Sequence, residues 1–304
     1  MARYDITRKQ LKEKNTIQRG EKVEGILNTF EIPVAGGFTN TYSALFSGNT
    51  NEKIDTGDSF KPSRSSSFSI STWVKYTGVG YELNTSLMSK MAGGRGAVFR
   101  GYRLQVIPEE GVRLTLQAVG SNQITNYTGK HSGSNALIPA KNQWNHIVAT
   151  YNGNFSGSGI NIFINGVSCV SQSVSGDIVN NFQLGLNDYA NTLDLSQGEI
   201  QDTSPISIGS RAGGATSVWI GNIDEFVFFN GELAQSDVTA LYNSGIPNLA
   251  TSIDYSKVQI SPAHYYRMGD DDGGTGTTVT DQVGSANGTL IGGVAPAFEE
   301  DVPS

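Results

Sequence analysis

Carboxylates gather in one short stretch near the C-terminal end of this 304-residue chain. Asp270, Asp271 and Asp272 are followed by two glycines, and Asp281 comes a little further on. Hard oxygen ligands in a Gly-rich turn suit Ca²⁺. The spacing does not match an EF-hand, because Asp281 stands where the loop would need a glutamate. Two interpretations stay open: a calcium site, and a turn capped by its own aspartates, which the spacing favours.

Paired carboxylates could also hydrolyse a glycosidic bond, if their carboxyl groups lie about 5–5.5 Å apart as in a retaining glycosidase. The nearest pairs are Asp224 with Glu225, and Glu199 with Asp202. Adjacent residues on a regular strand point to opposite faces, and Glu199 and Asp202 also differ in parity. We therefore expect no catalytic pair and no enzymatic activity.

Aromatic rings stack on sugar faces, and amide or carboxylate groups bind sugar hydroxyls. Tyr151 and Trp219 are candidates for such a platform, and so are Asn187 and Tyr189 in a long polar stretch over residues 168–204. These four residues are the predicted carbohydrate-binding set.

The N-terminal segment is basic. Residues 1–22 hold seven basic and three acidic residues, whereas the remainder holds 14 basic and 25 acidic ones. A basic arm on an acidic body can bind an acidic partner. A solvated leader or a short surface helix explains the basic residues equally well. An acidic body argues against nucleic-acid binding. The predicted docking residues are Arg3, Arg8, Lys9, Leu11, Lys12, Ile17 and Arg19.

Composition narrows the class of protein. The chain has 37 glycines and only 16% charged residues, which suits an all-β protein with many turns. The single cysteine, Cys169, cannot form an internal disulfide. No apolar run is long enough to cross a bilayer, and the first residues have no signal-peptide pattern, so we expect neither membrane insertion nor secretion through such a signal.

Short strands separated by turns must position these residues. Phe68–Lys75 alternates cleanly, Trp144–Tyr151 is apolar on both faces, and Ile160–Val167 alternates up to an Asn165-Gly166 turn of the type I′ hairpin kind. Leu233–Asn243 is the one predicted helix. This order of elements predicts an antiparallel β-sandwich.

The same segments resemble the successive motifs of laminin-G-like domains of the concanavalin A-like lectin/glucanase superfamily. The matching segments, in chain order, are Phe68–Lys75, Trp144–Gly153, Ile160–Val167, Ile206–Ser210 and Gly221–Gly245. The resemblance implies a jelly-roll β-sandwich, and a structural role for His146.

One departure from the family pattern concerns order. A segment that usually comes first in such domains has its likeness at Tyr265–Asp272, Thr278–Asp281 and Gly284–Leu290. The order looks permuted, and the Arg267–Asp270 segment followed by Thr280-Asp281 at this position is similar to laminin-G-like structural proteins of tailed bacteriophages. The predicted organisation is an arm over residues 1–35 and a sandwich over 36–304, whose C-terminal strands in 262–296 complete the sheets.

Two functions follow from the resemblance. The first is a non-enzymatic virion protein, such as a capsid decoration, tail or fibre-associated subunit. It would assemble in the host cytoplasm, dock on other virion proteins through its arm and occur in many copies or as a homo-oligomer. The alternative is an extracellular adhesin module that binds cell-surface polysaccharide.

Overall fold

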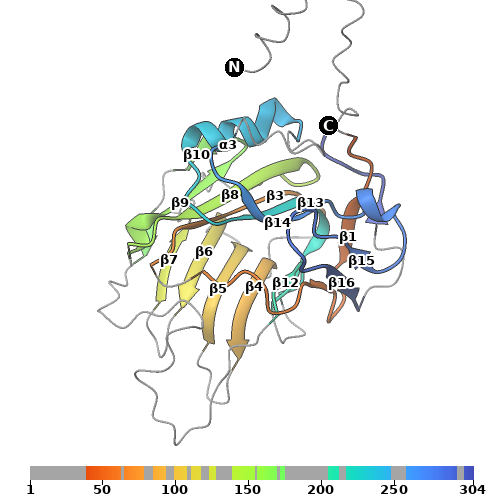
Figure 1. Ribbon diagram of the computed structural model, residues 1–304, viewed down its shortest axis with the longest axis horizontal. Coiled ribbons are helices and arrows are strands. Elements are labelled where there is room, and N and C mark those ends of the chain that lie inside the picture. The colour runs from red at the N-terminus through yellow and green to blue at the C-terminus, as the bar shows by residue number, and fades with distance from the viewer. Residues whose placement is uncertain are drawn as a thin grey trace, which may run out of the picture. The chain divides into compact units, whose positions relative to one another are not determined.

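The computed structural model (Figure 1) forms a two-layer β structure. The chain divides into two units, Met1–Gly37 and Phe38–Ser304, and all described residues lie in the second. The structure describes residues 39–62, 65–78, 85–93, 99–107, 111–117, 123–127, 139–154, 156–169, 172–174, 205–211, 217–247, 258–292 and 298–304.

The first sheet, sheet A, is antiparallel and has eight strands. Its strands, in spatial order, are β10 (Val167–Ser168), β9 (Ile160–Ile164), β8 (Trp144–Tyr151), β3 (Phe68–Tyr76), β13 (Ile220–Phe229), β1 (Ser43–Ser47) and β17 (Phe298–Glu299), and β14 (Pro262–Tyr266) also pairs with β13. The predicted Asn165-Gly166 turn joins β9 to β10, and both of its residues have positive φ, 52° and 77°. Strand β9 also pairs with β8, from which residues 152–159 separate it.

The second sheet, sheet B, is also antiparallel and has nine strands. Its strands, in spatial order, are β11 (Gln172–Val174), β7 (Gln123–Tyr127), β6 (Gly111–Gln117), β5 (Phe99–Ile107), β4 (Thr85–Gly93), β12 (Ser207–Ile208), β2 (Lys53–Asp55), β16 (Gly288–Ile291) and β15 (Thr278–Val279). Strands from the C-terminal segment thus enter both sheets: β14 and β17 join sheet A, and β15 and β16 join sheet B.

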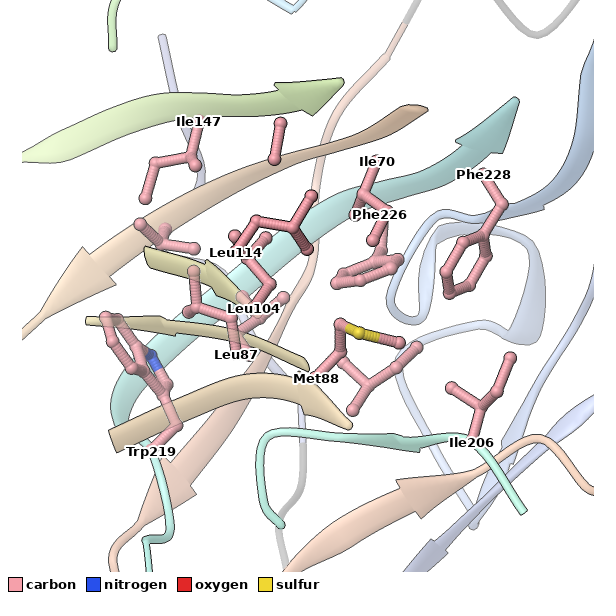
Figure 2. Packing of buried hydrophobic residues seen from close by; sticks show 14 of the residues in the cluster. Ile70, Leu87, Met88, Leu104, Leu114, Ile147, Ile206, Trp219, Phe226 and Phe228 are labelled. Atoms are coloured by element: carbon pink, nitrogen blue, oxygen red, sulfur yellow. The ribbon is translucent and has the colours of Figure 1, made fainter. Parts of the chain in front are cut away.

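The main core lies between the two sheets. Figure 2 shows Ile70, Phe226 and Phe228 of sheet A on one side, and below them Leu87, Met88 and Leu104 of sheet B on the other. Alternation along the regular strands sends every second side chain into this layer, as the sequence pattern predicted, and register shifts interrupt it in β4 and β13. The predicted all-β jelly-roll sandwich with one short helix is confirmed for the described residues.

Helix α3 (Gln235–Tyr242) covers the outer face of sheet A (Figure 1). Val238 and Leu241 of the helix pack in a second cluster with Val148 and Val227 of the sheet. Ala234 stands at the N-cap and forms no side-chain cap, but the Asp237 carboxylate accepts a hydrogen bond from the Ala234 backbone N–H at 3.0 Å. Asp237 thus supplies one half of a capping box from within the helix.

Short 3₁₀ helices complete the described chain, at η1 (Gly157–Gly159), η4 (Asn243–Gly245) and η6 (Asp270–Asp272). None of the helices in the described residues is both long enough and apolar enough to span a membrane.

Candidate functional site

The outer face of sheet B carries polar side chains from four adjacent strands, β6, β5, β4 and β12. Leu104, Leu114 and Ile208 of these strands lie in the core, so their neighbours along each strand point to the opposite face. We call this surface the polar face. Its members are Ser86, Ser89, Arg103, Gln105, Arg113, Thr115 and Ser207.

Strand register arranges the polar face in two rows. In the first row Ser207 pairs with Ser89, Ser89 pairs with Arg103, and Arg103 pairs with Thr115. Partners that face each other across antiparallel strands have Cβ atoms about 4.5–5.5 Å apart. Hydroxyl groups and a guanidinium therefore form a continuous line across four strands.

The second row lies two residues away on β5 and β6, and it includes Ser86 of β4, beyond a register shift in that strand. Gln105 pairs with Ser86 on one side and with Arg113 on the other. Arg113 Nη2 donates a hydrogen bond of 3.3 Å to Gln105 Oε1. This contact orients the Gln105 amide, because its oxygen accepts from Arg113 and its nitrogen points elsewhere.

Several polar atoms of the polar face are shielded from water and have no hydrogen-bond partner in the protein. The atoms concerned are Ser86 Oγ, Ser89 Oγ, Arg103 Nε, Gln105 Nε2, Thr115 Oγ1 and Ser207 Oγ. Thr115 is only 3% exposed, and the serines and Gln105 are fully buried. Leaving a buried polar group unpaired costs about 1–3 kcal/mol, so a cluster of such groups on one face needs a reason.

The polar face is also electropositive. Arg103 and Arg113 are half-buried, and Arg211 follows shortly after β12. Burial lowers the pKa of the Arg103 guanidinium to about 10, and the charges of Arg211 and Arg113 act in the same direction. Arg103 makes no ion pair within the part of the chain that the structure describes. The site thus offers hydroxyls, an amide and guanidinium groups to a polar ligand.

The predicted aromatic platform is wrong for two of its members. Tyr151 and Trp219 are both fully buried in the core between the sheets. The Tyr151 ring packs 5.7 Å from that of Phe68, and the Trp219 ring packs 5.3 Å from that of Tyr76. Neither ring can stack on a sugar, because each lies on the inner side of its sheet. Asn187 and Tyr189 lie outside the described residues.

The four aspartates do not come together as a calcium site. Asp270 accepts hydrogen bonds from the backbone N–H groups of Thr41 and Tyr42, at 2.8 and 3.0 Å. Asp272 accepts from the Thr280 backbone at 2.9 Å.

Asp270, Asp272 and Asp281 each bind a different piece of backbone, which is the capped-turn alternative. Asp281 accepts from the backbone N–H of Gly284 at 2.9 Å and lies 2.6 Å from His264 Nδ1, and Asp271 lies 3.5 Å from Arg267 Nη1. Among the described residues no group of three His, Cys, Asp or Glu side chains could hold a metal ion.

The expectation that Asp224 and Glu225 point to opposite faces assumed a regular strand, and the strand is irregular there. The pairing of β13 with β3 shifts between Asp224 and Val227, and Glu225 has a φ of 47°, so a β-bulge breaks the regular alternation. The Asn40 amide donates to Asp224 Oδ2 at 2.8 Å, and Arg267 Nε donates to Glu225 Oε1 at 3.3 Å. Both carboxyls therefore lie in one polar cluster rather than on opposite faces.

Burial governs the protonation of this cluster. It raises the pKa of Asp224 well above its usual range, and the Glu225 charge adds to that effect. Burial also raises the pKa of Glu225 to about 7, against the opposing charge of Arg267 and a hydrogen bond from Tyr265. Both carboxyls bind groups of the protein itself, so the cluster ties the segment from Thr39 onward to sheet A.

His146 has the structural role that the resemblance implied. It is 1% exposed, its Nε2 lies 2.8 Å from Ser71 Oγ, and its ring lies 5.0 Å from that of Trp73. Burial lowers the pKa of His146 to about 3, so the imidazole is neutral. The predicted docking residues of the arm, and Glu199 with Asp202, lie outside the described residues.

Sequence reasoning missed the polar face. The signal was present as alternation, because Arg103 and Gln105 flank Leu104 while Arg113 and Thr115 flank Leu114. It could show that each strand has a polar side, but not which residues stand opposite one another. That information is the strand register, which only the folded structure supplies.

The fold is a β-sandwich of two antiparallel sheets. Residues 46–202 match the family model described as concanavalin A-like lectin/glucanases superfamily (Laminin_G_3), and the chain belongs to this superfamily. No curated protein matches the chain by sequence.

A solved structure of low sequence identity shares the fold, and two others show a weaker likeness. A candidate carbohydrate-binding protein from Bacteroides ovatus is 16% identical with a TM-score of 0.51, and the match covers 86% of this chain and 61% of that one. The binding domain of botulinum neurotoxin serotype G is 18% identical over 59% of this chain and 36% of that one, with a TM-score of 0.40. A heptameric SAP-like pentraxin from Limulus polyphemus is 12% identical over 67% and 82% of the two chains, also with a TM-score of 0.40.

Proposed function

We propose that this chain is a non-enzymatic carbohydrate-binding module and that the polar face of sheet B binds the glycan. The observation that carries the proposal is the set of shielded, unpaired hydrogen-bonding groups on that face. Sugar hydroxyls both donate and accept hydrogen bonds, and serine, threonine and glutamine side chains can also do both. A bound saccharide would satisfy groups that the protein itself leaves unpaired.

The surroundings of the polar face agree with this function. Arg103 and Arg113 keep part of their surface exposed, so the face reaches solvent beside the buried hydroxyls. In the other large polar cluster, Glu225 and Arg267 are paired with each other, so that cluster serves the fold. Membership of a lectin superfamily, and a fold shared with a candidate carbohydrate-binding protein, support a binding function in general terms.

A glycan array tests the proposal. The wild-type protein should bind a restricted set of glycans, and Thr115→Val should weaken that binding, because the substitution keeps the shape of the side chain and removes its hydroxyl. Thr150→Val is the matched control. Thr150 is also buried with an unpaired hydroxyl, but it lies on the outer face of sheet A. Equal loss of binding in both variants, or no loss in Thr115→Val, would contradict the assignment of the site.

The virion hypothesis stays a prediction from the sequence resemblance. The arm that would dock on other virion proteins lies outside the described residues, so it carries no part of this proposal. A glycan-binding module displayed on a virion and one displayed on a cell surface would use the same polar face.

A further inference from the structure

Three arginines lie on or beside the polar face, and their arrangement indicates the charge of the ligand. Arg103 on β5 and Arg113 on β6 are diagonal neighbours, because Arg103 pairs with Thr115 and Arg113 pairs with Gln105. Diagonal neighbours on one face lie about 7–8 Å apart, within reach of long side chains. Arg211 approaches from the β12 side of the sheet.

Among the residues that the structure describes, Arg103 has no charge partner of the opposite sign. It is half-buried, its Nε donates no hydrogen bond, and the described residues provide it with no ion pair. The two charges that act on it are those of Arg211 and Arg113, both of its own sign. A partly desolvated guanidinium beside like charges is unfavourable in the free protein, and an anion would reverse that effect.

No acidic group of the described protein serves as that anion. Asp55 lies on the same outer face but belongs to β2, three strands from β5 in the order of the sheet, or about 14 Å away. Its carboxylate is already 2.8 Å from Lys53 Nζ. The charge that Arg103 lacks must therefore come from outside these residues.

Building on the function proposed above, we propose that the glycan bound by the polar face is acidic, and that Arg103 binds its carboxylate or sulfate group with Arg113 beside it. A guanidinium presents donors in a fixed fork that matches either group, and its hydrogen bonds to an anion are stronger than those to neutral groups. Hydroxyls of the same saccharide then meet Ser89, Thr115 and Ser207 along the first row.

The test compares acidic and neutral polysaccharides of one backbone. Affinity electrophoresis would use polygalacturonate and its carboxyl-reduced form for the carboxylate, and dextran sulfate and dextran for the sulfate. Arg103→Gln is the test variant. Lys75→Gln is the control, since it removes the same charge from sheet A, where Lys75 Nζ lies 2.6 Å from Asp301. Thermal unfolding of each variant shows whether it folds.

The wild-type protein should bind an acidic polymer at least about 10-fold more tightly than its neutral form. Arg103→Gln should lose about 10-fold or more of that affinity, whereas Lys75→Gln should change it less than about 2-fold. Equal affinity for the acidic and neutral forms, equal effects of the two variants, or binding to neither acidic polymer would overturn the inference. The glycan-binding proposal is tested separately, because Thr115→Val can still abolish binding to a neutral glycan on the array.

Discussion

Replacing Thr115 by valine should make the free protein more stable and its glycan binding weaker. Thr115 is 3% exposed in the middle of sheet B, and its hydroxyl has no partner in the protein. Valine has nearly the same shape and suits a strand equally well. The substitution therefore removes an unpaired polar group and changes little else.

The size of the effect follows from the cost of that group. An unpaired buried hydroxyl costs about 1–3 kcal/mol, and allowing for imperfect packing of the new methyl group we expect a gain of about 1 kcal/mol in the free energy of unfolding. In a domain of this size the melting temperature should rise by about 2–4 °C. Urea denaturation monitored by tryptophan fluorescence would measure the free energy directly.

Thr150→Val separates stability from binding. Its hydroxyl is unpaired and buried in the same way, so this variant should gain a similar free energy of unfolding. Its glycan binding should not change, because it lies on the sheet face covered by helix α3. A loss of about 1 kcal/mol or more in Thr115→Val would show that the hydroxyl does make a stabilising hydrogen bond, and would refute the reasoning.

Three further predictions concern the fold. Burial opposes ionisation of Asp281, but hydrogen bonds from His264 and from backbone amides outweigh this effect and lower the pKa of Asp281 to about 2. The ionised carboxylate should therefore stabilise the fold fully above pH 4, and this stabilisation should vanish as the pH falls toward 2. Asp281→Asn should remove that part of the acid unfolding curve, and an unchanged curve would argue against the contacts. The raised pKa of Glu225, about 7, predicts that the free energy of unfolding falls as the pH rises from 5 to 8; Glu225→Gln should flatten that slope, which urea titrations across this range would detect. Deleting residues 1–37 should leave the melting temperature of the sandwich nearly unchanged. Deleting residues 1–42 should cost about 3–5 kcal/mol, because Asp224 and Asp270 lose the donors of Asn40, Thr41 and Tyr42; equal melting temperatures of the two truncations would contradict the role of the buried cluster.

The parts of the fold that depend on local pattern could be predicted from the sequence. Strand β9 and the Asn165-Gly166 turn that leads to β10 follow from the period of two and the turn residues, and helix α3 follows from its apolar spacing and the proline beyond it. Both signals lie within a few residues of the structure that they specify, so no knowledge of distant contacts is needed.

The candidate site depends on contacts that the local pattern does not contain. Tyr151 and Trp219 are aromatic residues at strand positions, and only the packing of the two sheets decides that they face inward. The β-bulge at Glu225 breaks an alternation that any strand assignment assumes. Arg103 and Arg113 become neighbours through the register of β5 and β6, which a sequence does not state.

A crystal structure of the protein with a glycan identified on the array tests the central claim most directly. The account predicts that the saccharide lies on the outer face of sheet B, within hydrogen-bond distance of Thr115 Oγ1 and of the Arg103 guanidinium. A saccharide bound over helix α3, or at the turn that carries Asp270 and Asp281, would contradict it.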